Sequence, residues 1–84
     1  MSATADISPN TIIELVRETV LPDLPADFGA EADFFESGLD SMGVMQLVMF
    51  LEERFSKKVE PTELSRANFR NGSTLAALVN GKAA

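Results

Sequence analysis

The stretch from residue 33 to 47 most constrains the fold, because its sequence predicts a loop that ends in a tight turn and is followed directly by a helix. Gly38 supplies the permissive backbone that the turn needs. Asp40 has a side chain typical of a helix N-cap, with an oxygen for the unpaired N–H groups of a first turn. Ser41 then falls at the first helical position, facing solvent at the positive end of the helix dipole. We expect an anion to be attached to the Ser41 oxygen or to lie near it.

Helical periodicity dominates the rest of the chain, and no run of alternating apolar and polar residues predicts a strand. We predict helices over residues 9–20, 41–55 and 61–64. A last helix is predicted to begin at 71–73 and to end at Gly81. The predicted fold class is therefore all-α.

The 84 residues leave room for one small domain, 1–84, whose ends at 1–7 and 82–84 we expect to be frayed. Two prolines and one glycine between residues 22 and 29 predict a long loop after the first helix. In so small a domain such a loop needs apolar anchors. The candidates are Leu24, Phe28, Phe34 and Phe35.

The predicted helix over 41–55 carries two apolar stripes. One is the expected core face, formed by Val44, Leu47, Val48, Leu51 and Phe55. The other consists of Met42, Met45 and Met49, spaced three and four residues apart. A small bundle cannot easily bury both stripes, and flexible methionines suit surfaces that accept several partners. We predict that the methionines contact partner proteins, with plain core packing as the alternative.

Gly43 departs from this pattern, since a glycine inside a helix costs up to about 1 kcal/mol relative to alanine. We expect Gly43 to leave open space beside Ser41, or to be a tolerated surface glycine.

The composition argues against several classes of function. The chain has no His, Cys, Tyr or Trp, so the usual general bases and thiolates are missing, and we expect no enzyme. A small hydrolase that uses Ser41 as its nucleophile is an alternative, but the sequence shows no residue that could serve as its general base.

The net charge of −6 argues against nucleic-acid binding. No apolar run is long enough to span a membrane, and no signal pattern is visible, so we expect a cytoplasmic protein. The acidic residues Asp23, Asp27, Glu31 and Asp33 do not match a calcium loop, and no metal is expected.

A run of residues around the turn also matches a known family. The run is Phe35-x-x-Gly38-Leu39-Asp40-Ser41-Met42, followed by Val44-Met45-Gln46-Leu47-Val48 and Leu51-Glu52-Glu53-Arg54-Phe55. It resembles the acyl and peptidyl carrier proteins, and the resemblance extends from about Thr11 to Val79. It implies a four-helix bundle with three longer helices and one short helix. It also implies that Ser41, next to Asp40, receives a 4′-phosphopantetheine arm from coenzyme A, and that Met42, Met45 and Met49 contact partner enzymes.

The same resemblance implies the partners: a phosphopantetheinyl transferase, an acyl- or aminoacyl-activating ligase, and a downstream transferase or condensing enzyme. The cargo is expected as a thioester in fatty acid, polyketide or nonribosomal peptide biosynthesis, on a monomeric carrier. Gly43 and Gln46 stand where carriers of fatty acid synthesis often have acidic residues, which favours a specialised pathway. The stretch from Val59 to Phe69 resembles the D-alanyl carriers and discrete carriers for modified malonyl units. An unmodified helical adaptor with the same fold is the alternative.

Overall fold

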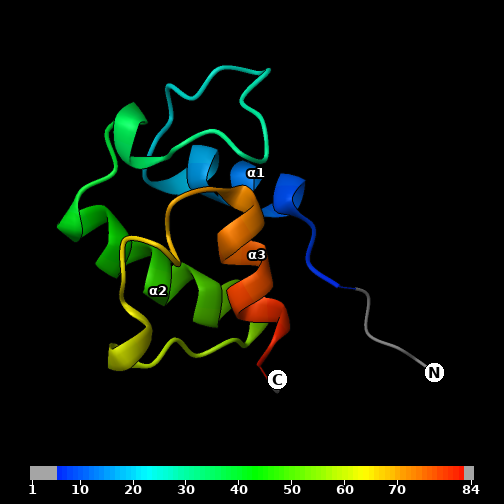
Figure 1. The fold of residues 1–84 in the computed structure, drawn as a ribbon, viewed down its shortest axis with the longest axis vertical. Helices are drawn as coiled ribbons and strands as arrows, with labels where there is room; N and C mark the ends of the chain where they lie inside the picture. Colours follow the sequence, from blue (N-terminus) through cyan, green and yellow to red (C-terminus); the bar gives the residue numbers. More distant parts are fainter. Residues whose placement is uncertain (1–5, 83–84) are drawn as a thin grey trace.

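The computed structural model describes residues 6–82, which form three α-helices and no strand. The helices are α1 (Pro9–Thr19), α2 (Ser41–Phe55) and α3 (Gly72–Asn80), and Figure 1 shows their arrangement. Two short 3₁₀ turns, Phe35–Ser37 and Pro61–Glu63, lie in the connections. The described part of the chain is all-α, as the helical periodicity predicts.

Side-chain caps explain where the first and last helices begin. The Ser8 hydroxyl oxygen accepts a hydrogen bond from the Thr11 N–H at 3.1 Å, and Pro9 takes the first helical position. The Asn71 side chain accepts the Thr74 N–H at 2.8 Å, and the Thr74 hydroxyl accepts the Asn71 N–H at 3.1 Å. This reciprocal pair is a capping box. The predicted starts of α1 and α3 are therefore confirmed, with Asn71 as the cap of α3.

The short helix predicted over 61–64 is present only as the 3₁₀ turn Pro61–Glu63. The Glu63 carboxylate accepts the Glu60 N–H at 2.7 Å, which closes the turn on itself. At Leu64 the backbone leaves helical geometry, with φ −80° and ψ 76°. The described residues thus form three helices and this turn rather than four helices.

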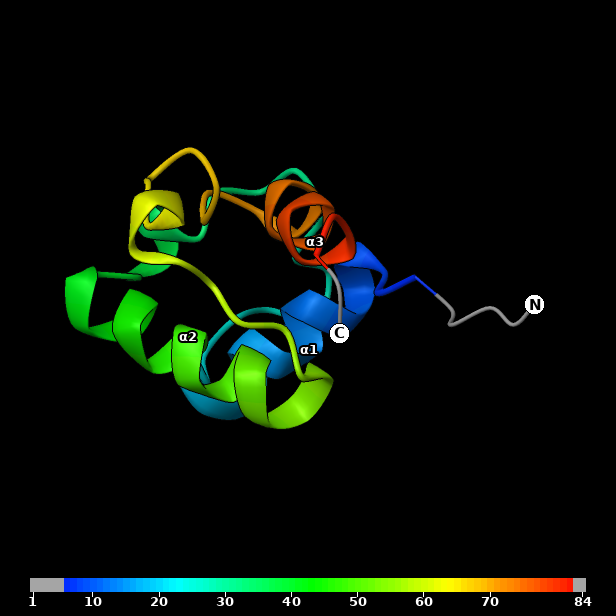
Figure 2. The same ribbon diagram turned by 90° about the horizontal axis from the view of Figure 1, so that it is seen from below.

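Helix α1 packs against both α2 and α3. After α2 the chain doubles back, so that the turn Pro61–Glu63 lies beside the first half of α2 before the chain continues to α3 (Figures 1 and 2). The returning segment therefore faces the start of α2, where Ser41 lies. No described helix has the length and apolar character needed to cross a membrane.

The core draws on every part of the described chain. Phe34 and Phe69, both fully buried, are its largest side chains. The Phe34 ring stacks on Phe28 with centroids 5.3 Å apart, and the Phe34 N–H donates to the Arg70 carbonyl at 2.7 Å. Each buried large apolar side chain contributes roughly 1.5–3 kcal/mol. The other buried apolar residues are Ile12, Ile13, Leu15, Val16, Leu24, Leu39, Leu47, Leu51, Val59, Leu75, Ala76 and Val79.

The anchors predicted for the long loop are largely confirmed. Leu24 and Phe34 are buried, and Phe28 packs against the core through its contact with Phe34. Phe35 is only half-buried, because it points toward the segment after residue 63 instead of into the centre. The acidic side chains of this loop do not gather into a metal-binding group within residues 6–82. Two of them bind other segments: Glu31 accepts the Ser73 hydroxyl at 2.6 Å, and Asp33 pairs with Arg70 at 3.5 Å.

The core face of α2 is centred on Leu47 and Leu51, which are fully buried. The remaining residues predicted for this face, Val44, Val48 and Phe55, pack against the core but stay partly exposed. The expectation of open space or a surface position at Gly43 is wrong. Gly43 is buried, and a Cβ atom there would lie 2.7 Å from Leu39 Cδ1.

The ends expected to be frayed, 1–7 and 82–84, fall mostly outside the described residues. Ile7 is tied to the end of α3 by two hydrogen bonds with the Asn80 side chain, at 2.8 and 2.9 Å. Lys82 donates a hydrogen bond to Glu63, and its carbonyl accepts one from Lys57 at 2.8 Å. These contacts connect both ends of the described chain to the body of the domain.

Candidate functional site

The turn before α2 aims the start of that helix outward. Gly38 has φ 114°, a left-handed conformation that a residue with a side chain adopts only at a cost. Its N–H donates to the Phe35 carbonyl at 3.2 Å, and the next N–H, of Leu39, donates to the Phe34 carbonyl at 3.1 Å. Leu39 is buried, so it fastens the turn to the core immediately before Asp40. The start of α2 is therefore fixed in place by the hydrogen bonds of the preceding turn and by the burial of Leu39 in the core.

Asp40 is the N-cap of α2, as the sequence predicts. Its carboxylate accepts the Gly43 N–H at 2.9 Å, and its carbonyl accepts the Val44 N–H at 2.9 Å. The N–H groups of Ser41 and Met42, at the first two helical positions, have no acceptor within the helix. They leave a local positive potential at this end of α2.

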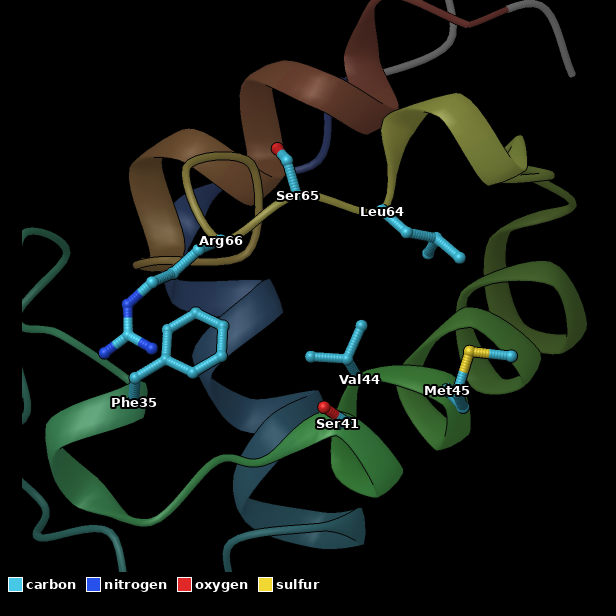
Figure 3. Close-up of a pocket in the computed structure, with 7 residues that line it drawn as sticks. All are labelled: Phe35, Ser41, Val44, Met45, Leu64, Ser65 and Arg66. Carbon is cyan, nitrogen blue, oxygen red and sulfur yellow. The ribbon is translucent and has the colours of Figure 1, made fainter.

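Ser41 is exposed at the first position of α2, and its hydroxyl forms no hydrogen bond with another described residue. Figure 3 shows its oxygen directed into a groove of about 340 Å³. One wall of the groove belongs to α2 and the other to the returning segment from 64 to 66. The groove is lined by Phe35, Ser41, Val44, Met45, Leu64, Ser65 and Arg66.

Arg66 is the charged side chain of this groove. Its guanidinium lies over the Phe35 ring, 4.3 Å from the ring centroid (Figure 3). A planar cation against an aromatic face is held by the ring quadrupole, so the stacking orients the guanidinium. The Ser65 side chain points away from the groove in the same view, and its oxygen accepts the Asn68 N–H at 3.1 Å.

The three methionines predicted as partner contacts are exposed on α2. Met42 has 70% of its surface accessible, Met45 56% and Met49 59%. Met45 also lines the groove beside Ser41. Leu64, on the opposite wall of the groove, is also exposed, with 37% of its surface accessible. Plain core packing does not describe these methionines, and a contact with partners stays a prediction.

Five residues of the groove were not predicted as site residues: Phe35, Val44, Leu64, Ser65 and Arg66. Phe35 was expected only to anchor a loop, and Leu64 to end a short helix. No sequence signal identified Leu64, because a single leucine in a polar stretch does not reveal whether it is buried or exposed. Nothing in the local sequence places Arg66 in the same groove as Ser41, because the two residues come to line it only through the return of the chain.

The groove is poorly equipped to activate Ser41 as a nucleophile. The charged side chain that lines it is an arginine, which stays protonated and cannot act as a base. The carboxylate next in sequence, Asp40, is directed to the Gly43 N–H. What the geometry offers is a solvent-facing hydroxyl, two free N–H groups and a cation beside an apolar groove.

Comparison with known proteins adds two findings. A family model described as "Phosphopantetheine attachment site" matches residues 10–80. A D-alanyl carrier protein from Streptococcus sanguinis (strain SK36) is 34% identical over 65 residues, which cover 76% of this chain and 80% of that protein. Both matches extend well beyond the turn at Gly38 and take in most of the described fold.

Proposed function

Because this chain belongs to the family of phosphopantetheine-binding carrier proteins, we propose that Ser41 is the residue that bears the 4′-phosphopantetheine arm. In this role the protein shuttles acyl or aminoacyl groups between enzymes of a biosynthetic pathway. The observation that carries the proposal is the Ser41 hydroxyl itself, exposed at the first position of α2 with its oxygen directed into a groove.

The residues around Ser41 fit a phosphate attached to it. The free N–H groups at the first two positions of α2 are donors for phosphate oxygens, and the helix dipole favours negative charge there. No described carboxylate lines the groove. Asp40 turns its carboxylate to the Gly43 N–H and so keeps the helix start ordered without competing for the donors.

When bound, the arm supplies a thiol that can carry cargo as a thioester. The chain has no cysteine and therefore no thiol of its own. The chain's own residues hold the attachment point rigid and accessible. Gly38 and Leu39 anchor the turn, Asp40 caps α2, and Ser41 presents its hydroxyl to the transferase. The family is normally non-catalytic, and we propose that this member is acted upon by enzymes and is not one itself.

The exposed methionines provide a surface for those enzymes. Met42, Met45 and Met49 follow Ser41 along α2, where a partner reaching for the arm must approach. Their flexible thioethers can adapt to a transferase, to an activating ligase and to a downstream transferase or condensing enzyme in turn. We propose a monomeric, cytoplasmic carrier, and the D-alanyl carrier relative favours an aminoacyl cargo.

Intact-mass measurement after incubation with coenzyme A and a broad-range phosphopantetheinyl transferase tests the proposal. We expect one phosphopantetheine unit on the wild type and none on Ser41→Ala. Ser37→Ala is the matched control, because Ser37 is an exposed serine four residues earlier and should leave loading intact. An unmodified wild type, beside a second carrier that the same transferase loads, would favour an unmodified helical adaptor.

A further inference from the structure

A second hollow lies beside the groove of Ser41 and carries two arginines. It has a volume of about 350 Å³ and is lined by Asp33, Arg66, Ala67 and Arg70. Arg66 lines both the hollow and the groove, so the two are neighbours. Its guanidinium lies on the side of the Phe35 ring away from the Ser41 oxygen (Figure 3). The charge of Arg66 therefore belongs to the hollow and not to the attachment point.

The two arginines keep charge that the described chain does not neutralise. Within residues 6–82 Arg66 forms no ion pair, whereas Arg17 and Arg54 each pair with a glutamate. Arg70 contacts Asp33 through its Nε atom at 3.5 Å, which is longer than the roughly 2.7–2.9 Å of a close charge-assisted hydrogen bond. The Arg70 side chain is also 64% exposed, so solvent screens this pair. Both guanidinium groups are available to an anion.

Asp33 is the carboxylate that lines the hollow, and it is engaged by the backbone. One of its oxygens accepts the Phe35 N–H at 2.8 Å and the Glu36 N–H at 3.4 Å, and the other faces Arg70. These bonds hold the Asp33 side chain against the turn that follows it. Two arginines against one carboxylate leave the lining of the hollow with a net positive charge.

The backbone that bears the arginines is anchored in the core. The Phe69 N–H donates to the Ser65 carbonyl at 3.2 Å and closes the turn that contains Arg66. The Arg70 carbonyl accepts the Phe34 N–H at 2.7 Å, and both phenylalanines are fully buried. Stacking on Phe35 further orients the Arg66 guanidinium. Because the cations sit on a fixed turn, less conformational freedom is lost when they bind a ligand.

We propose that this hollow is a docking point for a carboxylate on the surface of the phosphopantetheinyl transferase that modifies Ser41. This inference rests on the proposed function. An enzyme that covers the groove to reach Ser41 brings its surface over the hollow as well, because Arg66 forms part of both. The planar fork of a guanidinium matches the two oxygens of a carboxylate. On a chain of net charge −6, a positive point of this kind fixes the orientation in which the enzyme docks.

The first test uses the wild type. An unlabelled transferase is added to the unloaded protein without coenzyme A, and the arginine side chains are followed by NMR. We expect the Nε–H resonances of Arg66 and Arg70 to shift. Arg17 is the internal control, because its Nε–H donates to the Leu24 carbonyl at 3.2 Å and it does not line the hollow. Coenzyme A alone, without the enzyme, should leave all of these resonances unchanged.

Loading kinetics of three variants make the test specific. In Arg66→Gln and Arg70→Gln we expect kcat/KM to fall about three- to tenfold, mainly through a higher KM, because docking is weakened and the transfer step is not. The difference from the wild type should fade in 1 M sodium chloride, where charges are screened within about 3 Å. Lys58→Gln removes the same charge beyond the far end of α2, about 22 Å from Ser41 for a helix of 15 residues, and should match the wild type.

The outcomes separate this inference from the proposed function. A wild type that gains the arm, with both arginine variants loaded at its rate, would overturn the docking point and leave attachment at Ser41 intact. A wild type that gains no arm would overturn both. An equal fall in Lys58→Gln would show a general charge effect, and shifts with coenzyme A alone would show a site for small anions. Either result would overturn the docking of an enzyme carboxylate.

Discussion

Leu39 lies against the backbone of Gly43, so closely that a Cβ atom at residue 43 would be 2.7 Å from Leu39 Cδ1. Both residues are buried, and they flank the serine at the start of α2. The glycine is therefore part of how the turn is fastened, because the leucine that anchors the turn occupies the space of the missing side chain.

Gly43→Ala should destabilise the domain although alanine is the better helix former. Alanine gains about 1 kcal/mol of helix propensity, but overpacking of a filled site typically costs about 1–3 kcal/mol. We expect a net loss of up to about 2 kcal/mol, measured by urea unfolding. The double variant with Leu39→Ala should lose less than the sum of the two single variants, because removing the leucine relieves the contact. A Gly43→Ala protein as stable as the wild type would show that Leu39 moves aside freely.

Asp40→Ala should weaken the start of α2, because it removes the acceptor of the Gly43 N–H. Loss of an N-cap costs about 0.5–2 kcal/mol, and urea unfolding should show a loss in that range. Asp40→Asn is the control, since its side-chain oxygen can accept the same hydrogen bond and most of the stability should remain. Equal losses in both variants would mean that the charge of Asp40 matters more than the hydrogen bond.

Met45→Gln should separate stability from partner recognition. Exposed substitutions usually change stability by less than about 0.5 kcal/mol, so the urea midpoint should hardly move. If the methionine contacts the transferase, kcat/KM for loading should fall about tenfold, which corresponds to about 1.4 kcal/mol of lost contact. Met49→Gln should have a smaller effect, because Met49 lies about 12 Å from Ser41 along the helix, whereas Met45 lies about 6 Å from it. Unchanged loading in Met42→Gln, Met45→Gln and Met49→Gln would remove these residues from the docking surface.

The pair of Lys82 and Glu63 should make stability depend on acid pH. The hydrogen bond from Lys82, and after it the one from the Glu60 N–H, hold the pKa of Glu63 below its ordinary value of 4.5. A carboxyl whose pKa is lowered by folding stabilises the domain above its unfolded value, and this stabilisation is lost as pH falls through the folded value. Glu63→Gln should therefore be less stable than the wild type at pH 7, and the difference should shrink as pH falls below 4.5.

Urea unfolding of both proteins at several pH values measures this difference. Lys82→Met is the control, because without the ammonium the acid-dependent part of the difference should be reduced. A constant difference between the wild type and Glu63→Gln at every pH would contradict a lowered pKa of Glu63 in the folded protein.

The features predicted correctly from the sequence depend on interactions between residues close together in the chain. Ser8 and Asp40 were identified as caps from their positions alone, and both accept the N–H three residues later. The periodicity of 41–55 predicted α2 with the bounds that the structure has, and it placed the methionines on a second stripe that is indeed exposed. The short helix over 61–64 was overestimated, because Leu64 leaves helical geometry where the chain must turn back toward Phe69.

What the sequence determined by itself is the three helices α1, α2 and α3, the cap at Asp40 and the place of Ser41, since caps and periodicity depend on neighbours within a few residues. The tertiary structure decided the two features that local patterns do not contain. It filled the space at Gly43 with Leu39, and it brought Arg66 and Leu64 into the groove that Ser41 lines. The reason is physical: those contacts depend on how the turn packs and on the path by which the chain returns after α2, which the packing of the whole core sets.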